Sequence, residues 1–199
     1  MKKTILILLM LVLTGAGLGT AAYALFKDEA QVKGVSISTG DANLQIAMGS
    51  GWEDEHNFNN DLFQNMYPGF STGHSFKLKN VSQSDISLNI NSQISQKSGN
   101  WGSLKNLLLM ALIEYDSEAN AQLDLADQTA GNDAGVLKSS GWKSLDSWYT
   151  NSFSISSSNL NPDQIGYYNL WLKLTDEADD SVNQLGVNMV LQITGEQAN

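Results

Sequence analysis

The sequence offers few residues able to do catalytic chemistry, and most of these are carboxylates. Its two histidines are His56 and His74, and no H-E-x-x-H motif is present. His56 follows Glu53, Asp54 and Glu55, so this stretch and His74 together contain nitrogen and oxygen ligands for a metal ion. A catalytic zinc ion needs about three protein ligands on rigid elements and an open coordination position. Because this stretch leads into an asparagine-rich loop without helical spacing, the pattern favours a solvated acidic loop over a zinc site.

Two other patterns of polar residues are weaker candidates for a site. A second acidic cluster lies in an expected turn and consists of Asp176, Glu177, Asp179 and Asp180. Carboxylates this close can bind Ca²⁺, but the spacing lacks the alternating ligands and central glycine of an EF-hand loop. A serine nucleophile is disfavoured because there is no G-x-S-x-G motif and only two histidines to act as a base. The sequence therefore predicts no catalytic residues and no metal or cofactor site.

Aromatic residues offer a different kind of binding surface. The chain has five tryptophans, at positions 52, 101, 142, 148 and 171. Trp171 and Tyr167 alternate with the apolar residues of the segment 168–174, which predicts that they are less buried than those residues. Exposed aromatic rings stack on sugars, and jelly rolls include lectins. Carbohydrate binding is therefore one alternative, although aromatic residues in sandwiches mostly pack in cores or cover sheet edges.

The rest of the chain alternates apolar and polar residues in short segments, as half-buried β-strands do. Stretches rich in Ser, Asn, Asp and Gly separate these segments, as expected of turns. The apolar faces fall in 44–48, 76–78, 86–90, 153–155, 168–174 and 185–193. A further strand near residue 32 brings the total to about eight. The pattern predicts an all-β chain, a two-sheet jelly-roll sandwich of about eight antiparallel strands with short helical turns in long loops.

One segment fits both a helix and a strand. The apolar residues between 104 and 115 match helical spacing, yet Leu107 to Ile113 is also a continuous apolar run typical of a buried strand. We expect a helical turn at Ser103 to Asn106, followed by a buried strand. Two long polar loops are expected, Gly49 to Gly73 and Asp116 to Gly141, the second with a short helix around 119–126.

The N-terminus has the three-part form of a secretory signal. Lys2 and Lys3 precede an apolar core at 5–13, and Ala22-Tyr23-Ala24 fits an A-x-A cleavage site before Leu25. The alternative is an uncleaved membrane anchor, since the apolar run approaches the ~20 residues of a spanning helix. Glycines in its second half favour cleavage. We therefore expect a signal helix at 1–24, a single domain at 25–199 and an extracellular location.

Composition narrows the range of partners. Removal of residues 1–24 takes away two lysines and no acidic residue, so the net charge changes from −10 to −12. Such an acidic surface does not attract nucleic acid or anionic lipid through its overall field, and the chain has no arginine to bind phosphate in a bidentate manner. The chain also has no cysteine, so an exported form is stabilised by packing or assembly without disulfides.

Three segments resemble the TasA/camelysin family of exported, fibre-forming proteins. The first, GTAAYALFKDEAQVKGVSISTGDANLQI, is similar to the family's signal end and first strands. The second, YPGFSTGHSFKLKNVSQSDISLNI, resembles its Pro-Gly turn and the two following strands. The third, YYNLWLKLTDEADDSVNQLGVNMVLQITGEQ, resembles its C-terminal hairpin, including an entry at Asn183, Gln184 and Gly186. The two long loops are unmatched, and Leu25 precedes the aromatic Phe26 where the family more often starts closer to it.

This resemblance implies a jelly-roll subunit of fibres in a biofilm matrix or on the cell surface. It also implies processing by a signal peptidase of the SipW type, and fibres in which the freed N-terminal segment of one subunit completes the sheet of the next. Camelysin itself has been described as a surface metalloprotease, so an enzymatic alternative stands beside the structural function.

The predicted cleavage site lies directly before a strand-like segment, residues 25–37, whose composition suggests a role for the cut. Left unpaired, the segment 25–37 exposes apolar side chains that gain by burial, at about 0.8 kcal/mol per methylene. These residues are Leu25, Phe26, Ala30, Val32, Val35 and Ile37. Gly34 shifts the alternation and predicts a bulge or a flexible joint.

Cleavage after Ala24 would free this candidate donor strand to pair with an open sheet edge on another copy. Together with the resemblance, this segment predicts a non-enzymatic, self-assembling, head-to-tail polymer. The resemblance implies signal peptidase and other matrix or cell-surface components as further partners. The alternative is that the segment is an ordinary first strand of its own domain.

Overall fold

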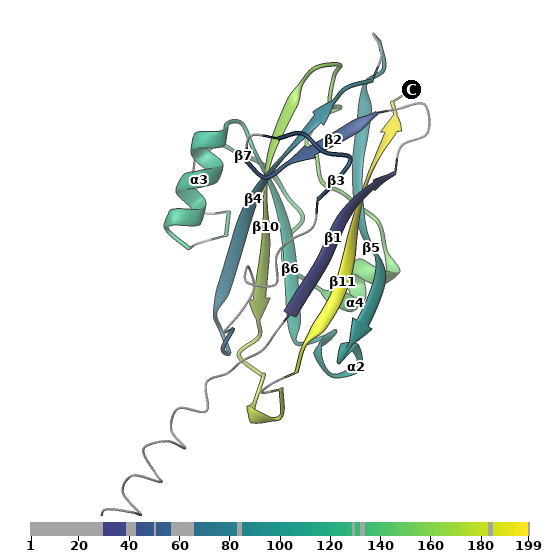
Figure 1. The fold of residues 1–199 in the computed structure, drawn as a ribbon. Coiled ribbons are helices and arrows are strands. Elements are labelled where there is room, and N and C mark those ends of the chain that lie inside the picture. Colours follow the sequence, from purple (N-terminus) through teal and green to yellow (C-terminus); the bar gives the residue numbers. More distant parts are fainter. Residues whose placement is uncertain are drawn as a thin grey trace, which may run out of the picture.

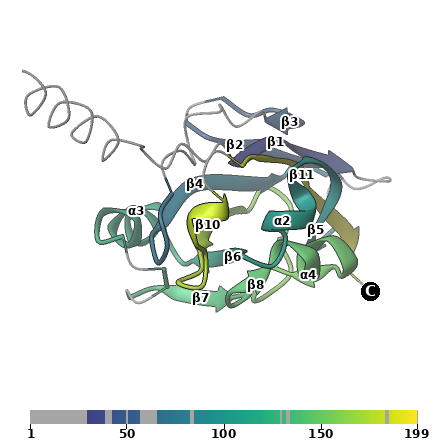
Figure 2. The same ribbon diagram turned by 90° about the horizontal axis from the view of Figure 1, so that it is seen from below.

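The computed structural model describes residues 30–38, 43–49, 51–56, 66–82, 85–128, 130–131, 134–182 and 185–198. In these residues the chain is mostly β-structure, with eleven strands in two sheets. Eight of the strands have four residues or more, and the other three have two. The two sheets face each other across the core (Figures 1 and 2).

The first sheet has five strands in the order β3-β1-β11-β5-β9. Their bounds are β3 Glu55–His56, β1 Ala30–Ser38, β11 Val187–Gln197, β5 Leu88–Gly99 and β9 Phe153–Ser154. All neighbours are antiparallel except β1 and β11, which run parallel. The N-terminal and C-terminal strands of the described chain therefore lie side by side (Figure 1).

The second sheet follows the order β2-β4-β10-β6-β7, with β8 also paired to β6. Its strands are β2 Leu44–Ala47, β4 Ser71–Asn80, β10 Ile165–Leu174, β6 Leu108–Tyr115, β7 Val136–Ser139 and β8 Lys143–Ser144. Every pairing in this sheet is antiparallel.

Short helices lie in the connections. They are α2 Trp101–Leu104, α3 Glu118–Ala126, α4 Leu145–Thr150 and the 3-10 turn η1 Asp180–Val182. Ser117 and Ser144 are the N-caps of α3 and α4, and each side-chain oxygen accepts a hydrogen bond from a backbone N–H in the first turn. α3 lies against the side of β4 that faces away from the first sheet (Figure 2). Among the described residues, no helix has both the length and the apolar character needed to cross a bilayer.

The core is built by the alternating residues of the long strands. On β11, Val187, Met189, Leu191 and Ile193 are buried, and the residues between them are partly exposed. Tyr168, Leu170, Leu172 and Leu174 of β10 pack into the same cluster, opposite. A single slip of register would turn each set to solvent, so this pattern fixes how the strands align.

A second, smaller cluster lies between α3 and the outer face of the second sheet. It contains Ala111, Ile113, Tyr115, Ala121 and Trp171. β6 is therefore buried on both faces, which explains its continuous apolar run.

This cluster encloses a buried carboxylate. Asp124 of α3 is fully buried, and both its oxygens accept from the backbone N–H of Gly131, at 3.1 and 2.9 Å. The hydroxyl of Tyr115 donates to the same carboxylate. Asn169 of β10 donates to the carbonyl oxygen of Ala121 at 2.8 Å. These bonds fasten α3 to the sheet.

The structure confirms several of the predictions made for the fold and corrects others. The two-sheet β-structure, the buried strand after residue 107 and the short helix near 119–126 are all present. The predicted helical turn begins earlier than expected, since α2 starts at Trp101. The described strand pairings are antiparallel as predicted, with the one exception that β1 runs parallel to β11. The signal helix expected at 1–24 lies outside the described residues.

Candidate functional site

The candidate site is the pairing of β1 with β11. The register joins Ala30 to Val187, Val32 to Met189, Val35 to Leu191 and Ile37 to Ile193. The β11 residues of these pairs are at most 1% exposed. Four of the predicted assembly residues, Ala30, Val32, Val35 and Ile37, thus lie at register positions beside the core-forming residues of the C-terminal strand.

The register of β1 shifts between Val32 and Val35. This irregularity falls at Gly34, where the sequence predicts a bulge or joint. A bulge interrupts the hydrogen-bond ladder locally. The β1–β11 contact is therefore two short ladders, from Ala30 to Val32 and from Val35 to Ser38.

β11 has its own support on its other side. It pairs with β5 along its whole length, from Val187 opposite Gly99 to Gln197 opposite Leu88. β1 lacks this support, because its other neighbour β3 pairs with it only at Val35 and Ser36. In the described residues, β11 is thus held along its whole length by β5, whereas β1 lies near the edge of the sheet with little pairing on its outer side.

A short segment, 53–56, fastens the β1 side of the molecule. Glu53 exchanges two backbone hydrogen bonds with Ile46 of the second sheet, both of 2.9 Å. Glu55 and His56, as β3, pair with β1 of the first sheet. The predicted acidic loop therefore contains a segment that bonds to both sheets. Among the described residues, β3 pairs with the outer edge of β1 at Val35 and Ser36 and at no other residue of β1.

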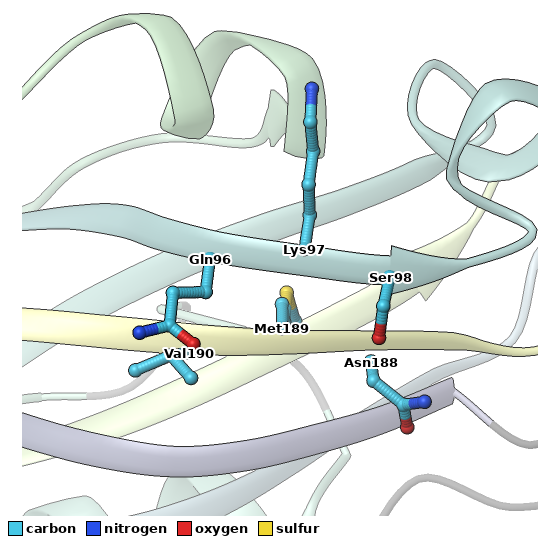
Figure 3. Close-up of a pocket in the computed structure, with 6 residues that line it drawn as sticks. All are labelled: Gln96, Lys97, Ser98, Asn188, Met189 and Val190. Carbon is cyan, nitrogen blue, oxygen red and sulfur yellow. The ribbon is translucent and has the colours of Figure 1, made fainter.

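A shallow hollow lies beside this site, where β5 and β11 change register at Val190 and Leu191. It is lined by Gln96, Lys97, Ser98, Asn188, Met189 and Val190 (Figure 3). Asn188 points from β11 towards β1, and its side-chain oxygen is buried without a hydrogen-bond partner. The Lys97 ammonium lies 3.6 Å from the ring centre of Tyr149 and 4.9 Å from that of Trp101. No pattern in the sequence indicates this hollow, because it depends on a bulge between strands far apart in the chain.

The residues weighed as metal ligands are spread over several elements. Nδ1 of His56 lies 3.2 Å from a carboxylate oxygen of Glu53. His74 lies on β4, opposite Leu170 of β10. Within the described chain, no group of three or more His, Asp or Glu side chains is arranged to hold a metal ion.

The second acidic cluster lies in the turn after β10. A carboxylate oxygen of Asp176 is 4.0 Å from the Lys173 ammonium. Hydrogen bonds from the side chain and then the backbone of Ser181 lower the pKa of the exposed Asp179. These contacts are those of a charged surface turn.

The prediction that Trp171 is less buried is wrong. Its side chain is 1% exposed, because α3 covers this face of the sheet. Its ring lies across Gly73, where an added Cβ would come within 2.6 Å of it. Tyr167 is partly exposed, as predicted. Trp142 is the tryptophan with a large exposed fraction among the described residues, at 36%.

The expected cleavage residues Ala22, Ala24 and Leu25, and the assembly residue Phe26, lie outside the described residues. No protein-family model matches the chain, and no curated protein matches its sequence.

Proposed function

We propose that this chain is a secreted structural subunit of extracellular matrix or cell-surface fibres, with a jelly-roll domain at 25–199. In this proposal, signal peptidase cuts near Ala24, and the freed N-terminal segment of one copy takes the β1 position on the next. The observation that supports it is the β1–β11 pairing itself. β1 is a parallel strand near the edge of its sheet, and its other neighbour, β3, pairs with it at two residues. It lies on β11, which β5 pairs along its whole length.

The exchange preserves the contacts that the chain makes with itself. β1 and β11 lie at opposite ends of the sequence, so no tight hairpin ties them together. A β1 strand from a second copy can form the same seven register pairs with β11. Exchange of an identical element is a low-cost route to assembly. Because each copy would give one strand and receive one, the contact is head-to-tail and extends as a filament.

The concentration of the protein decides whether β1 pairs with its own domain or with another copy. A strand tethered to its own domain has an effective concentration in the millimolar range for a short linker. The exchanged form is therefore favoured where copies accumulate at high local concentration, as exported proteins do at a surface. Cleavage would add to this by releasing the segment from the membrane.

Engineered cysteines test the exchange directly, because the natural chain has none. Ser36 and Gln192 are register partners, and paired residues in neighbouring strands have Cα atoms about 5 Å apart, within the range of a disulfide. We expect the double variant Ser36→Cys/Gln192→Cys, assembled at high concentration and then oxidised, to give a ladder of covalent multimers on non-reducing gels. The same variant oxidised when dilute should give monomers that no longer polymerise until reduced.

The matched control is Ser36→Cys/Asn89→Cys, because Asn89 lies on β5 opposite Glu196 and does not pair with β1. It should form neither the ladder nor the locked monomer. If the first variant forms intramolecular disulfides alone, even from filaments or at high concentration, β1 stays with its own domain and the proposed exchange is wrong.

Two alternatives have separate tests. A surface metalloprotease would bind stoichiometric zinc and cleave casein, with both properties lost on His56→Ala. A carbohydrate-binding surface protein would bind glycans as a monomer. Because Trp171 is buried, Tyr167→Ala is the variant that tests this binding on the face proposed from the sequence.

A further inference from the structure

We infer that the outer face of the five-stranded sheet binds a second copy of this chain, side by side. This face is the surface of β5 and β11 that points away from the core. The inference goes beyond the proposed strand exchange, since it concerns the face of the sheet and not its edge.

The face is rich in side-chain amides and hydroxyls. At its centre, Asn91 lies opposite Thr194, Gln93 opposite Gln192, and Gln96 opposite Val190. All six side chains are partly or fully exposed. Within the described part of the chain, the amide groups of Asn91, Gln93, Gln96 and Gln192 make no hydrogen bond to other residues. Their donors and acceptors are therefore available to another molecule.

Strand formation does not explain this composition. Asn is depleted in β-strands, and four of the six central residues are amides, whereas Thr194 and Val190 are of the β-branched kind that favours strands. Solubility does not explain it either, because charged residues are the usual means of keeping an exposed sheet apart from others. An uncharged face of exposed amides is therefore open to close contact with another molecule.

The charges on the chain point to a second copy as the occupant. The protein carries 21 acidic and 11 basic residues. Along β5 and β11 the charged residues are Lys97 and Glu196, and Lys97 directs its ammonium over the rings of Tyr149 and Trp101. Two copies that met through the acidic segments 53–56 or 176–179 would bring like charges together, and like charges in an interface oppose association. This face lets two acidic molecules approach with little repulsion.

The chemistry of the face is also self-complementary. Each Asn or Gln amide contains both a donor and an acceptor, so one row of amides matches another row of the same sequence. Flat sheets pack face to face about 10 Å apart, and amide ladders add hydrogen bonds to such contacts. On the second sheet, by contrast, α3 covers part of the outer side.

Charged substitutions at the centre of the face test the inference. In Gln93→Glu/Gln192→Glu, four carboxylates would meet in the pair of copies. We expect self-association, measured by sedimentation on the purified and processed protein, to weaken by at least about tenfold. We also expect negative-stain images to show single filaments in place of laterally joined ones. Raising the salt concentration should restore part of the association, because it screens these charges.

The matched control is Gln122→Glu/Gln128→Glu, which adds the same charge at two exposed positions on or next to α3. It should associate like the unaltered chain. The inference is overturned if the unaltered chain shows no lateral association, if the face variant associates normally, or if the control weakens association equally. Loss of binding to a neutral polysaccharide with unchanged self-association would also overturn it, since the face would then bind sugar. Lateral pairs without filaments would refute the strand exchange and leave this inference standing.

Discussion

Replacement of Asp124 by alanine tests how α3 is held on the second sheet. Asp124 accepts from the backbone N–H of Gly131 and from the hydroxyl of Tyr115, and it is fully buried. In Asp124→Ala the buried hydroxyl of Tyr115 and the partly exposed N–H of Gly131 both lose their acceptor. An unsatisfied buried donor costs about 1–3 kcal/mol, so the loss at Tyr115 should lower the free energy of unfolding by about that amount. A fall of about 2 kcal/mol lowers the Tm of a domain of this size by about 4–8 °C.

Tyr115 provides a second readout in the same variant. Burial, followed by the hydrogen bond and the negative charge of Asp124, raises the pKa of Tyr115 above its ordinary value near 10. A raised folded pKa means that this tyrosine stabilises the fold below the unfolded pKa, and that the contribution is lost as the pH rises through the folded pKa. In Asp124→Ala the pKa of Tyr115 should move down, so ultraviolet absorbance should show one tyrosine ionising at lower pH.

Asp127→Asn is the control, because Asp127 is exposed at the C-terminal end of the same helix. It should change stability by less than about 0.5 kcal/mol. Urea unfolding and the alkaline titration are measured on all three proteins. If Asp124→Ala unfolds at the same urea concentration as the unaltered chain, the buried carboxylate does not hold α3 and the reasoning fails.

Three further changes have defined outcomes. Gly73→Ala places a Cβ 2.6–2.8 Å from ring atoms of Trp171, so urea unfolding should show that the free energy of unfolding falls by about 1–3 kcal/mol. The control is Gly102→Ala, which should cause no such fall because no atom lies within 4 Å of the added Cβ. Asn80→Ala removes a buried amide that donates to two backbone carbonyls at 2.7 and 2.8 Å; a loss below about 1 kcal/mol would contradict this bridging role. Burial and the negative charge of Glu114 on β6 raise the pKa of Tyr168. The free energy of unfolding should therefore fall by about 1.4 kcal/mol per pH unit above roughly pH 10. Tyr168→Phe should make that fall shallower.

Local patterns in the sequence predict the long strands because each strand buries one face. From Val187 to Gly195 the residues of β11 alternate between buried and partly exposed, and the same alternation is visible in the sequence. The continuous apolar run of β6 is ambiguous in the sequence, because a buried helix and a strand buried on both faces produce the same run. The structure explains it by α3, which covers the outer face and buries Ala111 and Ile113.

The errors of the sequence analysis come from contacts between distant parts of the chain. Trp171 has the position of an exposed residue in an isolated strand, and only the docking of α3, some fifty residues earlier, buries it. The parallel partner of β1 is similarly non-local, because β11 lies at the other end of the sequence. Alternation indicates which face of a strand is buried, but it contains no information about which strand is the neighbour.

The chain between β1 and β2 limits how strand exchange can occur, and this limit gives a last prediction. β1 ends at Ser38 and β2 begins at Leu44, and this length of chain spans at most about 20 Å. If β1 of one copy lies on β11 of the next, the two copies are therefore held close together at a fixed spacing. Insertion of six Gly and Ser residues after Gly40 should roughly double this reach.

The insertion separates the two arrangements of β1. With β1 on its own domain, a longer flexible connection costs only about 0.6 kcal/mol per doubling of its length, so the unfolding of the dilute monomer should hardly change. With β1 exchanged, the longer connection no longer fixes the spacing, so the axial repeat in negative-stain images should lengthen or become irregular. A replacement of residues 39–42 by an equally long Gly-Ser sequence is the control for composition. Filaments with an unchanged, regular repeat after the insertion would mean that this connection does not link neighbouring copies, and strand exchange through β1 would then be refuted.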